Sequence, residues 1–280
     1  MTASWQPYGQ LAQDRLRVVT WNVWGRYGPW AERQQAIVDG LRRIDADVVC
    51  LQEAWQTGDH CQPAALAGAL GLEWVYAPAF EINGGWSGNA ILSRWPIASH
   101  DITELPMAGG GATDTDPGER RVLLFGELNA PRGPIQVFTT HLSWRADWSG
   151  VRQAQVAAIG QVVADRKPRQ FPAVLCGDFN AEPGSDEMRM LTGQAAVAVP
   201  GVVFKDAFAA RGEGPGWTIT DTNPYAAASL DDRSRVDYVL VGWPKAGGAG
   251  QILSAWVAGQ EAPGGLAGSD HYAVVADLRC

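Results

Sequence analysis

Short apolar runs and amphipathic segments alternate along the first part of the chain. Residues 17–23 (RVVTWNV) and 47–51 (DVVCL) are rich in β-branched side chains, which predicts two buried strands. Between them, apolar side chains recur at helical spacing, and a proline stands near the first turn, which predicts a helix over residues 29–44. The side chains on its apolar face are Trp30, Ile37, Leu41 and Ile44. This strand–helix–strand order is typical of α/β proteins.

The rest of the chain continues with the same kinds of element. Helices are predicted at residues 64–70, 151–164 and 185–191. Further strands are predicted at residues 73–78, 88–93, 122–128, 135–141, 171–176, 236–241 and 273–278. Glycine and proline separate most of these strands, as antiparallel neighbours require. The order of elements repeats roughly before and after residue 134, which suggests two similar halves.

Length and composition indicate one globular domain. The 280 residues, 46% of them hydrophobic, are enough for one two-sheet α/β unit, so residues 1–280 are expected to form a single domain with residues 1–15 as a loosely ordered N-terminal extension. No apolar run approaches 18 residues, so stable membrane insertion is not expected. The N-terminus has no signal pattern, so a cytoplasmic location is the expectation, with secretion left open. Nothing in the sequence indicates an obligate protein partner.

Charge argues against some partners. The formal net charge is −8, and the chain contains only three lysines, Lys167, Lys205 and Lys245. An acidic chain is repelled by the phosphates of duplex nucleic acid unless a local basic groove outweighs the total charge. A polybasic membrane-binding patch is also not expected.

Polar side chains mark six ends of the predicted strands. They are Asn22, Glu53, His141, Asp178 with Asn180, Asp237, and Asp270 with His271. Taken singly, each residue could simply cap a strand or form a turn. Together they would place several carboxylates at one end of a sheet, where they repel one another unless a cation or ligand compensates. Oxygen ligands without cysteine suit Mg²⁺ or Mn²⁺.

Seven motifs in a fixed order give the sequence a family resemblance. They are TWNVWG (20–25), DVVCLQEAW (47–55), GNAILSRWPI (88–97), TTHLSW (139–144), GDFNAEPGS (177–185), RVDYVLV (235–241) and GSDHYAVVADL (268–278). In this order the chain resembles the endonuclease/exonuclease/phosphatase superfamily. The resemblance implies an α/β fold, a four-layer sandwich of two mixed β-sheets packed face to face with helices outside. It also implies hydrolysis of a phosphoester with the help of a divalent metal.

The resemblance also implies a metal site. Glu53 corresponds to the principal Mg²⁺ ligand, and Asn22 lies beside it. Asp270 would add a ligand or a supporting carboxylate. Mg²⁺ is the expected cofactor, with Mn²⁺ as a possible substitute.

Catalytic roles carry over in the same way. Asp178 would orient and deprotonate the attacking water, and Asn180 would hold the phosphate or the nucleophile. His271 would contact the phosphoryl oxygen, with its ring fixed by Asp237. His141 would donate to the phosphate. Placed carboxylates and histidines are the groups that phosphoryl transfer needs for positioning and charge stabilisation.

Details of the motifs limit the choice of substrate class. Trp24 stands where the abasic-site DNA repair branch carries aspartate, and TWNVWG with LQEAW is closer to the neutral sphingomyelinase branch and to bacterial metal-dependent hydrolases. The segment 215–241 has the form of those bacterial members, in which the position of Asn223 often lies near the active site. Trp217, in the same segment, could stack on a base or cover an apolar tail.

Arginines near the motifs are candidates for binding an anionic group. They are Arg26, Arg120, Arg121, Arg145 and Arg152. A guanidinium suits phosphate because it donates two parallel hydrogen bonds. Arg145 directly follows TTHLSW and is therefore the preferred candidate, so the predicted substrate-binding residues are Asn180, His141, Asn223, Arg145 and Trp217.

Three functional hypotheses follow. The first is a divalent-metal-dependent phosphodiesterase that acts on a small or lipid-linked phosphoester. The second is an endo- or exonuclease acting on DNA or RNA, against which the acidic charge counts. The third, a catalytically silent binding module, is disfavoured because every expected catalytic position is retained.

Overall fold

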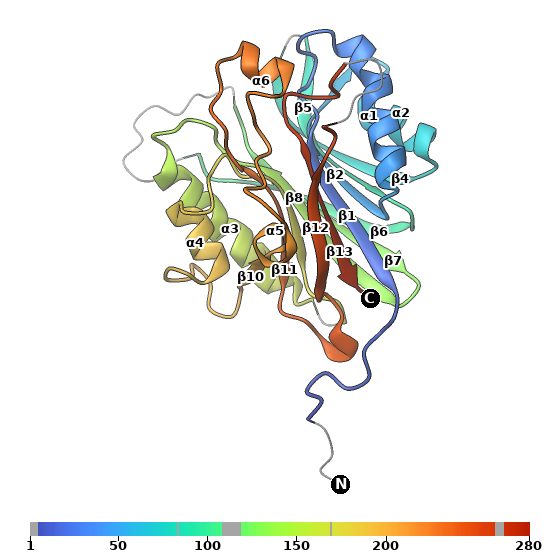
Figure 1. Ribbon diagram of the computed structural model, residues 1–280, viewed down its shortest axis with the longest axis vertical. Coiled ribbons are helices and arrows are strands. Elements are labelled where there is room, and N and C mark those ends of the chain that lie inside the picture. The colour runs from blue at the N-terminus through green and yellow to red at the C-terminus, as the bar shows by residue number, and fades with distance from the viewer. Residues whose placement is uncertain (1–4, 83, 108–118, 169, 261–265) are drawn as a thin grey trace.

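Two mixed β-sheets pack face to face, and helices cover their outer faces (Figure 1). The computed structural model describes residues 5–82, 84–107, 119–168, 170–260 and 266–280. The first sheet has the strand order β12 (Ile252–Ala258), β13 (Ala273–Arg279), β1 (Arg15–Asn22), β2 (Val48–Thr57), β5 (Gly85–Ser93) and β4 (Glu73–Ile82), and the short β3 (His60–Cys61) pairs with β2. The second has the order β10 (Phe204–Asp206), β11 (Asp237–Gly242), β9 (Val174–Asp178), β8 (Gly133–His141), β7 (Val122–Ala130) and β6 (Ile97–Glu104).

The helices complete a four-layer sandwich. Helices α1 (Trp30–Ile44) and α2 (Gln62–Leu70) lie on the first sheet, and α3 (Ser149–Arg166) and α4 (Asp186–Thr192) lie on the second (Figure 1). The remaining helical segments are α5 (Ala207–Arg211), α6 (Pro224–Ala228) and the 3₁₀ turn η1 (Ala246–Gly248). The predicted α/β sandwich is therefore confirmed. None of the helices in the described ranges combines the length and the apolarity needed to cross a membrane.

Alternation along the central strands fills the layers. Val18 of β1 and Val174 of β9 point between the sheets, whereas their neighbours Val19 and Leu175 face the helices on either side. Because β1 is buried on both faces, its sequence shows neighbouring apolar residues and not an alternation of apolar and polar ones. Burying each such side chain contributes roughly 1.5–3 kcal/mol, so the core depends on these central strands.

Several elements differ from the predicted ones. Strands β6, β10 and β12 and helices α5 and α6 were not predicted. Strand β6 is an exposed edge strand, with the sequence IASHDITE, so it lacks the apolar pattern that marks a buried strand. The suggested repeat around residue 134 is confirmed in the order of elements, because β1–α1–β2 and β8–α3–β9 are both parallel strand–helix–strand units followed by antiparallel strands. The halves do not correspond to the sheets, however, since the last two strands of each half join the sheet of the other half. Strands β12 and β13 join the first sheet from the far end of the chain, and β6 and β7 join the second from before residue 134.

Residues 5–14, which precede β1, form no helix or strand but contact the turn at η1. The Ala12 amide donates to the Gly247 carbonyl at 2.9 Å, and the Gly247 amide donates to the Tyr8 carbonyl at 2.8 Å. The extent of the domain and of its N-terminal extension stays a prediction.

Strand direction brings the motif residues to one end of the sandwich. Strands β1 and β2 are parallel, as are β8 and β9, so Asn22, His141 and Asp178 lie where their strands end. Glu53 lies inside β2, directly after Gln52, where the pairing of β2 with β1 ends. Strand β11 runs antiparallel to β9, and its first residue, Asp237, pairs directly with Asp178. Strand β13 is antiparallel to β1, which brings the segment before β13 to the same end.

Candidate active site

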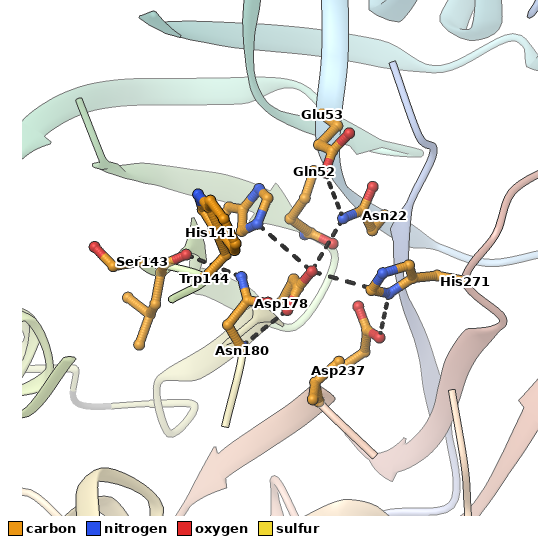
Figure 2. Close-up of polar contacts among 12 residues, drawn as sticks. Asn22, Gln52, Glu53, His141, Ser143, Trp144, Asp178, Asn180, Asp237 and His271 are labelled. Atoms are coloured by element: carbon orange, nitrogen blue, oxygen red, sulfur yellow. Dashed lines mark hydrogen bonds and ion pairs between the residues drawn. The ribbon is translucent and has the colours of Figure 1, made fainter. Parts of the chain in front are cut away.

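Asp178 is the centre of a buried polar cluster (Figure 2). Its Oδ2 atom accepts a hydrogen bond from Asn22 Nδ2 at 3.0 Å and lies 3.6 Å from His141 Nε2 and 3.9 Å from His271 Nδ1. Its Oδ1 accepts from the Asn180 amide at 2.9 Å. The structure thus brings together side chains from both sheets around one carboxylate.

Behind Asp178, a histidine and an aspartate form a close pair. His271 Nδ1 lies 2.8 Å from Asp237 Oδ2, and Asp237 is fully buried. The other carboxylate oxygen, Oδ1, has no hydrogen-bond partner among the described residues. The backbone of His271 is held as well, because its carbonyl accepts from Trp21 Nε1 at 2.9 Å and its amide donates to Ser269 Oγ. The position of the imidazole is therefore fixed from both ends.

Glu53 and Asp270 form the other side of the site. Asn22 Nδ2 also donates to Glu53 Oε1 at 3.1 Å, so one amide nitrogen joins the carboxylates of Glu53 and Asp178. The Asn22 oxygen accepts from the Trp24 amide at 3.0 Å, so binding a metal would use the second lone pair of that oxygen. Asp270 lines the same pocket and accepts a hydrogen bond from the hydroxyl of the adjacent serine.

Left-handed backbone conformations occur at three of these positions. Trp24, Glu53 and Asn180 have φ values of 55°, 53° and 48°. Glu53 lies in an irregularity of the β2–β5 pairing, which turns its side chain away from the sheet faces and toward the pocket. Such conformations cost of order 1–3 kcal/mol and persist where the surroundings fix them. Gly177 has a φ of 152°, and a Cβ there would approach the Thr140 carbonyl oxygen at 2.1 Å, so the position before Asp178 requires glycine.

The electrostatics of the site indicate an excess of negative charge. Burial raises the pKa of Asp178 to about 7, and the neighbouring Asp237 adds to the shift. Burial, followed by the charge of Asp270, raises the pKa of Glu53, and burial also raises that of Asp270. Since partly buried carboxylates keep their charge best when it is compensated, Glu53 and Asp270 would suit a hard divalent cation.

A second grouping of possible ligand atoms lies deeper. Asp178, Asp237 and His271 each offer one atom, and these atoms all lie within 4.8 Å of one another. The short contact between His271 and Asp237 already uses the imidazole nitrogen of this set. The carboxylates at Glu53 and Asp270 therefore suit a metal better.

The two histidines have opposite protonation tendencies. Burial disfavours the charged form of His271, but the charges of Asp237, Asp270 and Asp178 outweigh burial and raise its pKa well above the usual value. Burial and the nearby Arg121 lower the pKa of His141. At neutral pH His271 is thus suited to donate as a cation and His141 as a neutral imidazole.

The cluster opens into a pocket of about 300 Å³. Glu53, His141, Asp178, Asn180, Asp270 and His271 all line it. The rest of its lining includes the charged residues Glu119 and Arg121 and six aromatic residues, Trp24, Tyr27, Trp55, Phe80, Trp86 and Trp144. The predicted catalytic and metal-binding residues are therefore at or directly behind one pocket, with Asn22 and Asp237 beneath its surface.

Three predicted substrate-binding residues do not line this pocket. Trp217 lies against the guanidinium of Arg233 and lines a separate surface depression. Asn223 is fully buried, and its side chain caps α6 and donates to the Ser269 carbonyl at 2.8 Å. Arg145 is exposed and stacks over the Trp144 and Trp148 rings. Contact of these residues with a substrate stays a prediction.

Arg121 lies in the pocket instead. It is 3% exposed, its guanidinium lies over the Phe80 ring, and Nη2 donates to Glu119 Oε2 at 3.1 Å. Arg121 was one of five arginines singled out in the sequence, and nothing in the local pattern separates it from the exposed Arg120 beside it.

Arg33 is a functional residue that the sequence interpretation missed. It is fully buried in α1 and donates to five backbone carbonyls. Four of them, at Val23, Trp24, Gly25 and Tyr27, belong to the loop after β1, and the fifth is at Gly268. A signal was present, because position 33 is four residues before Ile37 and so lies on the apolar face of the helix.

Gln52 is a second missed residue, and it connects the two sheets beneath the pocket. Its Nε2 donates to Thr139 Oγ1 of β8 at 2.9 Å, and its oxygen accepts from Thr20 Oγ1 of β1 at 3.2 Å. Because all three side chains are buried, this bridge fixes the spacing of the sheets at the base of the site.

Comparisons with known proteins show relatives of this chain in sequence and in fold. Protein angel of Drosophila melanogaster is 29% identical over 298 residues, which cover 95% of this chain and 78% of the fly protein. Inositol phosphosphingolipids phospholipase C of Schizosaccharomyces pombe is 26% identical over 205 residues, or 65% of this chain and 45% of that protein. The solved structure of D. rerio TDP2, complexed with single strand DNA product, has a TM-score of 0.72 at 19% identity and covers 96% of this chain and 100% of its own.

The match to a protein family extends over most of the chain. Residues 19–271 match the family described as Endonuclease/Exonuclease/phosphatase family, and this range includes every residue of the cluster around Asp178. The chain therefore belongs to the Endonuclease/Exonuclease/phosphatase family of phosphoester hydrolases.

Proposed function

We propose that this protein is a divalent-metal-dependent phosphodiesterase that acts on a small or lipid-linked phosphoester. One observation carries the proposal: a carboxylate, a histidine–aspartate pair and a second pair of carboxylates surround a single pocket. These are the groups that hydrolysis of a phosphoester requires, namely a base, a cationic donor and a place for a metal.

Asp178 is the proposed general base. It accepts the proton of the attacking water as the oxygen–phosphorus bond forms, and the leaving oxygen departs on the opposite side. Asn180 supports this water. Because its Nδ2 donates to the Leu142 carbonyl at 3.0 Å, its side-chain oxygen is suited to accept a hydrogen bond from the water. This arrangement favours contact with the nucleophile over contact with the phosphate.

The histidines face the phosphoryl oxygens in this proposal. His271, kept protonated by Asp237, donates to an oxygen on which negative charge develops. His141 donates as a neutral imidazole from the adjacent strand end. The buried position of both side chains strengthens these interactions, because fewer waters compete for the same oxygens.

Glu53 and Asp270 would hold the metal, with Asn22 beside them. When bound there, Mg²⁺ or Mn²⁺ would neutralise charge on the phosphoryl group and lower the pKa of a bound water. Asn22 has the further role of holding Glu53 and Asp178 at a fixed separation through its amide nitrogen.

The Glu53→Gln variant tests the metal site. It keeps the size of the side chain and removes its charge, so we expect the apparent affinity for Mg²⁺ to fall by about tenfold or more. Titration of activity and of calorimetric heat with Mg²⁺ would measure the change. Glu73→Gln, which makes the same substitution at an exposed position, is the matched control. An unchanged titration would exclude Glu53 as a metal ligand.

The size and lining of the pocket favour a small substrate, and nuclease activity is the second candidate function. A volume of about 300 Å³ with aromatic walls can cover a compact organic group or the first part of an acyl chain. The same rings could stack on a nucleobase, and the related structure with single strand DNA product gives this alternative specific support.

A panel of phosphoesters distinguishes these substrates. We expect cleavage of aryl phosphodiesters in Mg²⁺ or Mn²⁺ and slow or absent cleavage of plasmid DNA and single-stranded RNA. Sphingomyelin and phosphatidylcholine test the lipid-linked class. If nucleic acid is cut faster than every other ester, and the rate falls steeply with salt, the nuclease alternative replaces the proposal. If no ester is cleaved with any divalent ion, the catalytic proposal fails.

A further inference from the structure

Two donors on the pocket wall converge on one carboxylate oxygen. Glu119 Oε2 accepts from Arg121 Nη2 at 3.1 Å and from Trp144 Nε1 at 2.8 Å. The donors come from segments next to two different strands, since Arg121 precedes β7 and Trp144 follows β8. All three residues line the same pocket as His141 and Asp178. The oxygen thus occupies a site built for an anion.

The Arg121 guanidinium is incompletely used by this carboxylate. In the ion pairs Arg17–Asp277 and Arg233–Asp221, both Nε and Nη2 donate to the two oxygens of one carboxylate. Arg121 uses Nη2 alone, and its buried Nε has no partner among the described residues. A buried cation with an unused donor on the same edge has capacity for a group that offers one oxygen to each donor, which Glu119 does not do here.

A phosphate group has these properties. It carries several acceptor oxygens in a tetrahedral arrangement and can receive both guanidinium donors and the indole N–H. Glu119 can give way to such a group, because its side chain is 31% exposed and Trp144 is 54% exposed. Arg121, at 3% exposure, stays in place and keeps its need for an anionic partner.

We propose that Arg121 and Trp144 form a binding site for a second phosphate of the substrate and that Glu119 occupies this site in the free protein. The inference rests on the proposed phosphodiesterase function and names its substrate class: a phosphodiester with another phosphate on the same molecule. The scissile group must face Asp178 and His271, whereas Trp144 lies at the exposed rim. The second phosphate therefore lies on the rim side of the scissile one.

The test compares two esters that differ by one phosphate. They are the 4-nitrophenyl ester of thymidine 5′-phosphate and the same ester carrying an additional 3′-phosphate, both assayed at saturating Mg²⁺. Wild-type protein is expected to have a lower KM for the second ester. In Glu119→Gln, which weakens the internal competitor, we expect the KM for that ester to fall by about fivefold, the effect of breaking one partly exposed ion pair. The KM for the first ester and both kcat values should stay within about twofold.

Two further variants distinguish the loss of a hydrogen-bond donor to the second phosphate from an unspecific effect of mutation. Trp144→Phe keeps an aromatic ring and removes the N–H, so the KM for the two-phosphate ester should rise relative to the KM for the other ester. Glu104→Gln is the matched control, since Glu104 pairs with the exposed Arg120 outside the pocket. Equal KM changes for both esters in Glu119→Gln, or no wild-type preference for the second phosphate, would overturn the proposal.

A binding measurement keeps the proposal testable if neither ester is hydrolysed. Calorimetric titration with thymidine 3′,5′-bisphosphate and with thymidine 5′-phosphate, in Mg²⁺, measures how much the second phosphate adds to the affinity. The site is supported, even without catalysis, if the bisphosphate binds more tightly than the monophosphate and if Glu119→Gln increases this difference. Equal affinities in both proteins would overturn it. Failure of hydrolysis alone would count against the catalytic proposal and not against the anion site.

Discussion

Asp178→Asn is expected to lower kcat by about 10³-fold, within the range typical of removing a general acid or base. An asparagine at this position has the same shape and can keep the contact with the Asn180 amide, but it cannot take the proton of an attacking water. Hydrolysis of an aryl phosphodiester at saturating Mg²⁺ would measure the loss. The effect should appear in kcat with little change in KM, since the substrate contacts remain.

Two controls show whether the loss of rate is specific to Asp178 and independent of unfolding. Asp165→Asn makes the same chemical change on the exposed face of α3 and should leave the rate unaltered. The melting temperature of Asp178→Asn should stay close to that of the wild type. Burial raises the pKa of Asp178 to about 7, so the fold already tolerates a neutral group there. A variant with near-normal kcat would remove Asp178 from the role of base.

Asp237→Asn is expected to lower kcat by about 10²-fold through its effect on His271. The amide oxygen of asparagine can still accept from His271 Nδ1, so the ring should keep its orientation. The negative charge is lost, however, and this charge is a principal cause of the raised pKa of His271. The imidazole should therefore lose its proton at lower pH and provide less positive charge to the phosphoryl group.

Nuclear magnetic resonance of the imidazole can test this explanation separately from the rate. The titration of His271 should move to lower pH in Asp237→Asn, and the folded state should persist, because the uncompensated Oδ1 atom gives Asp237 no further structural bond. Wild-type rates together with an unshifted titration would show that the pair has no catalytic role.

The position of the site could be predicted from the sequence because it depends on strand direction. Asn22, Glu53 and Asp178 each follow a buried apolar run, and parallel strands place such ends together. The separation between the sheets carries no such signal. Gln52 contacts Thr139, which lies 87 residues away in the sequence. A glutamine after an apolar run marks a strand end in any α/β protein, so the sequence does not indicate that this one bridges two sheets.

The choice among arginines shows why the rest could not be predicted. Arg145 follows the TTHLSW motif and yet lies outside the pocket, since the chain turns after His141 and its side chain stacks on Trp144 and Trp148. Arg121 is buried because β7 enters the sheet one residue later. The burial of Arg121 also depends on the contact between its guanidinium and the Phe80 ring, and the spacing of motifs contains no information about that contact.

Arg33 makes distant parts of the chain behave as one unit. Its guanidinium is bound at once to the loop after β1 and to Gly268, 235 residues away from it. The wall that carries Trp24 and the segment that leads to His271 therefore cannot open separately. A fluctuation that releases either segment must first free a cation from carbonyl oxygens in a dry interior. Exchange of the backbone amides of both segments with solvent should accordingly share a single rate.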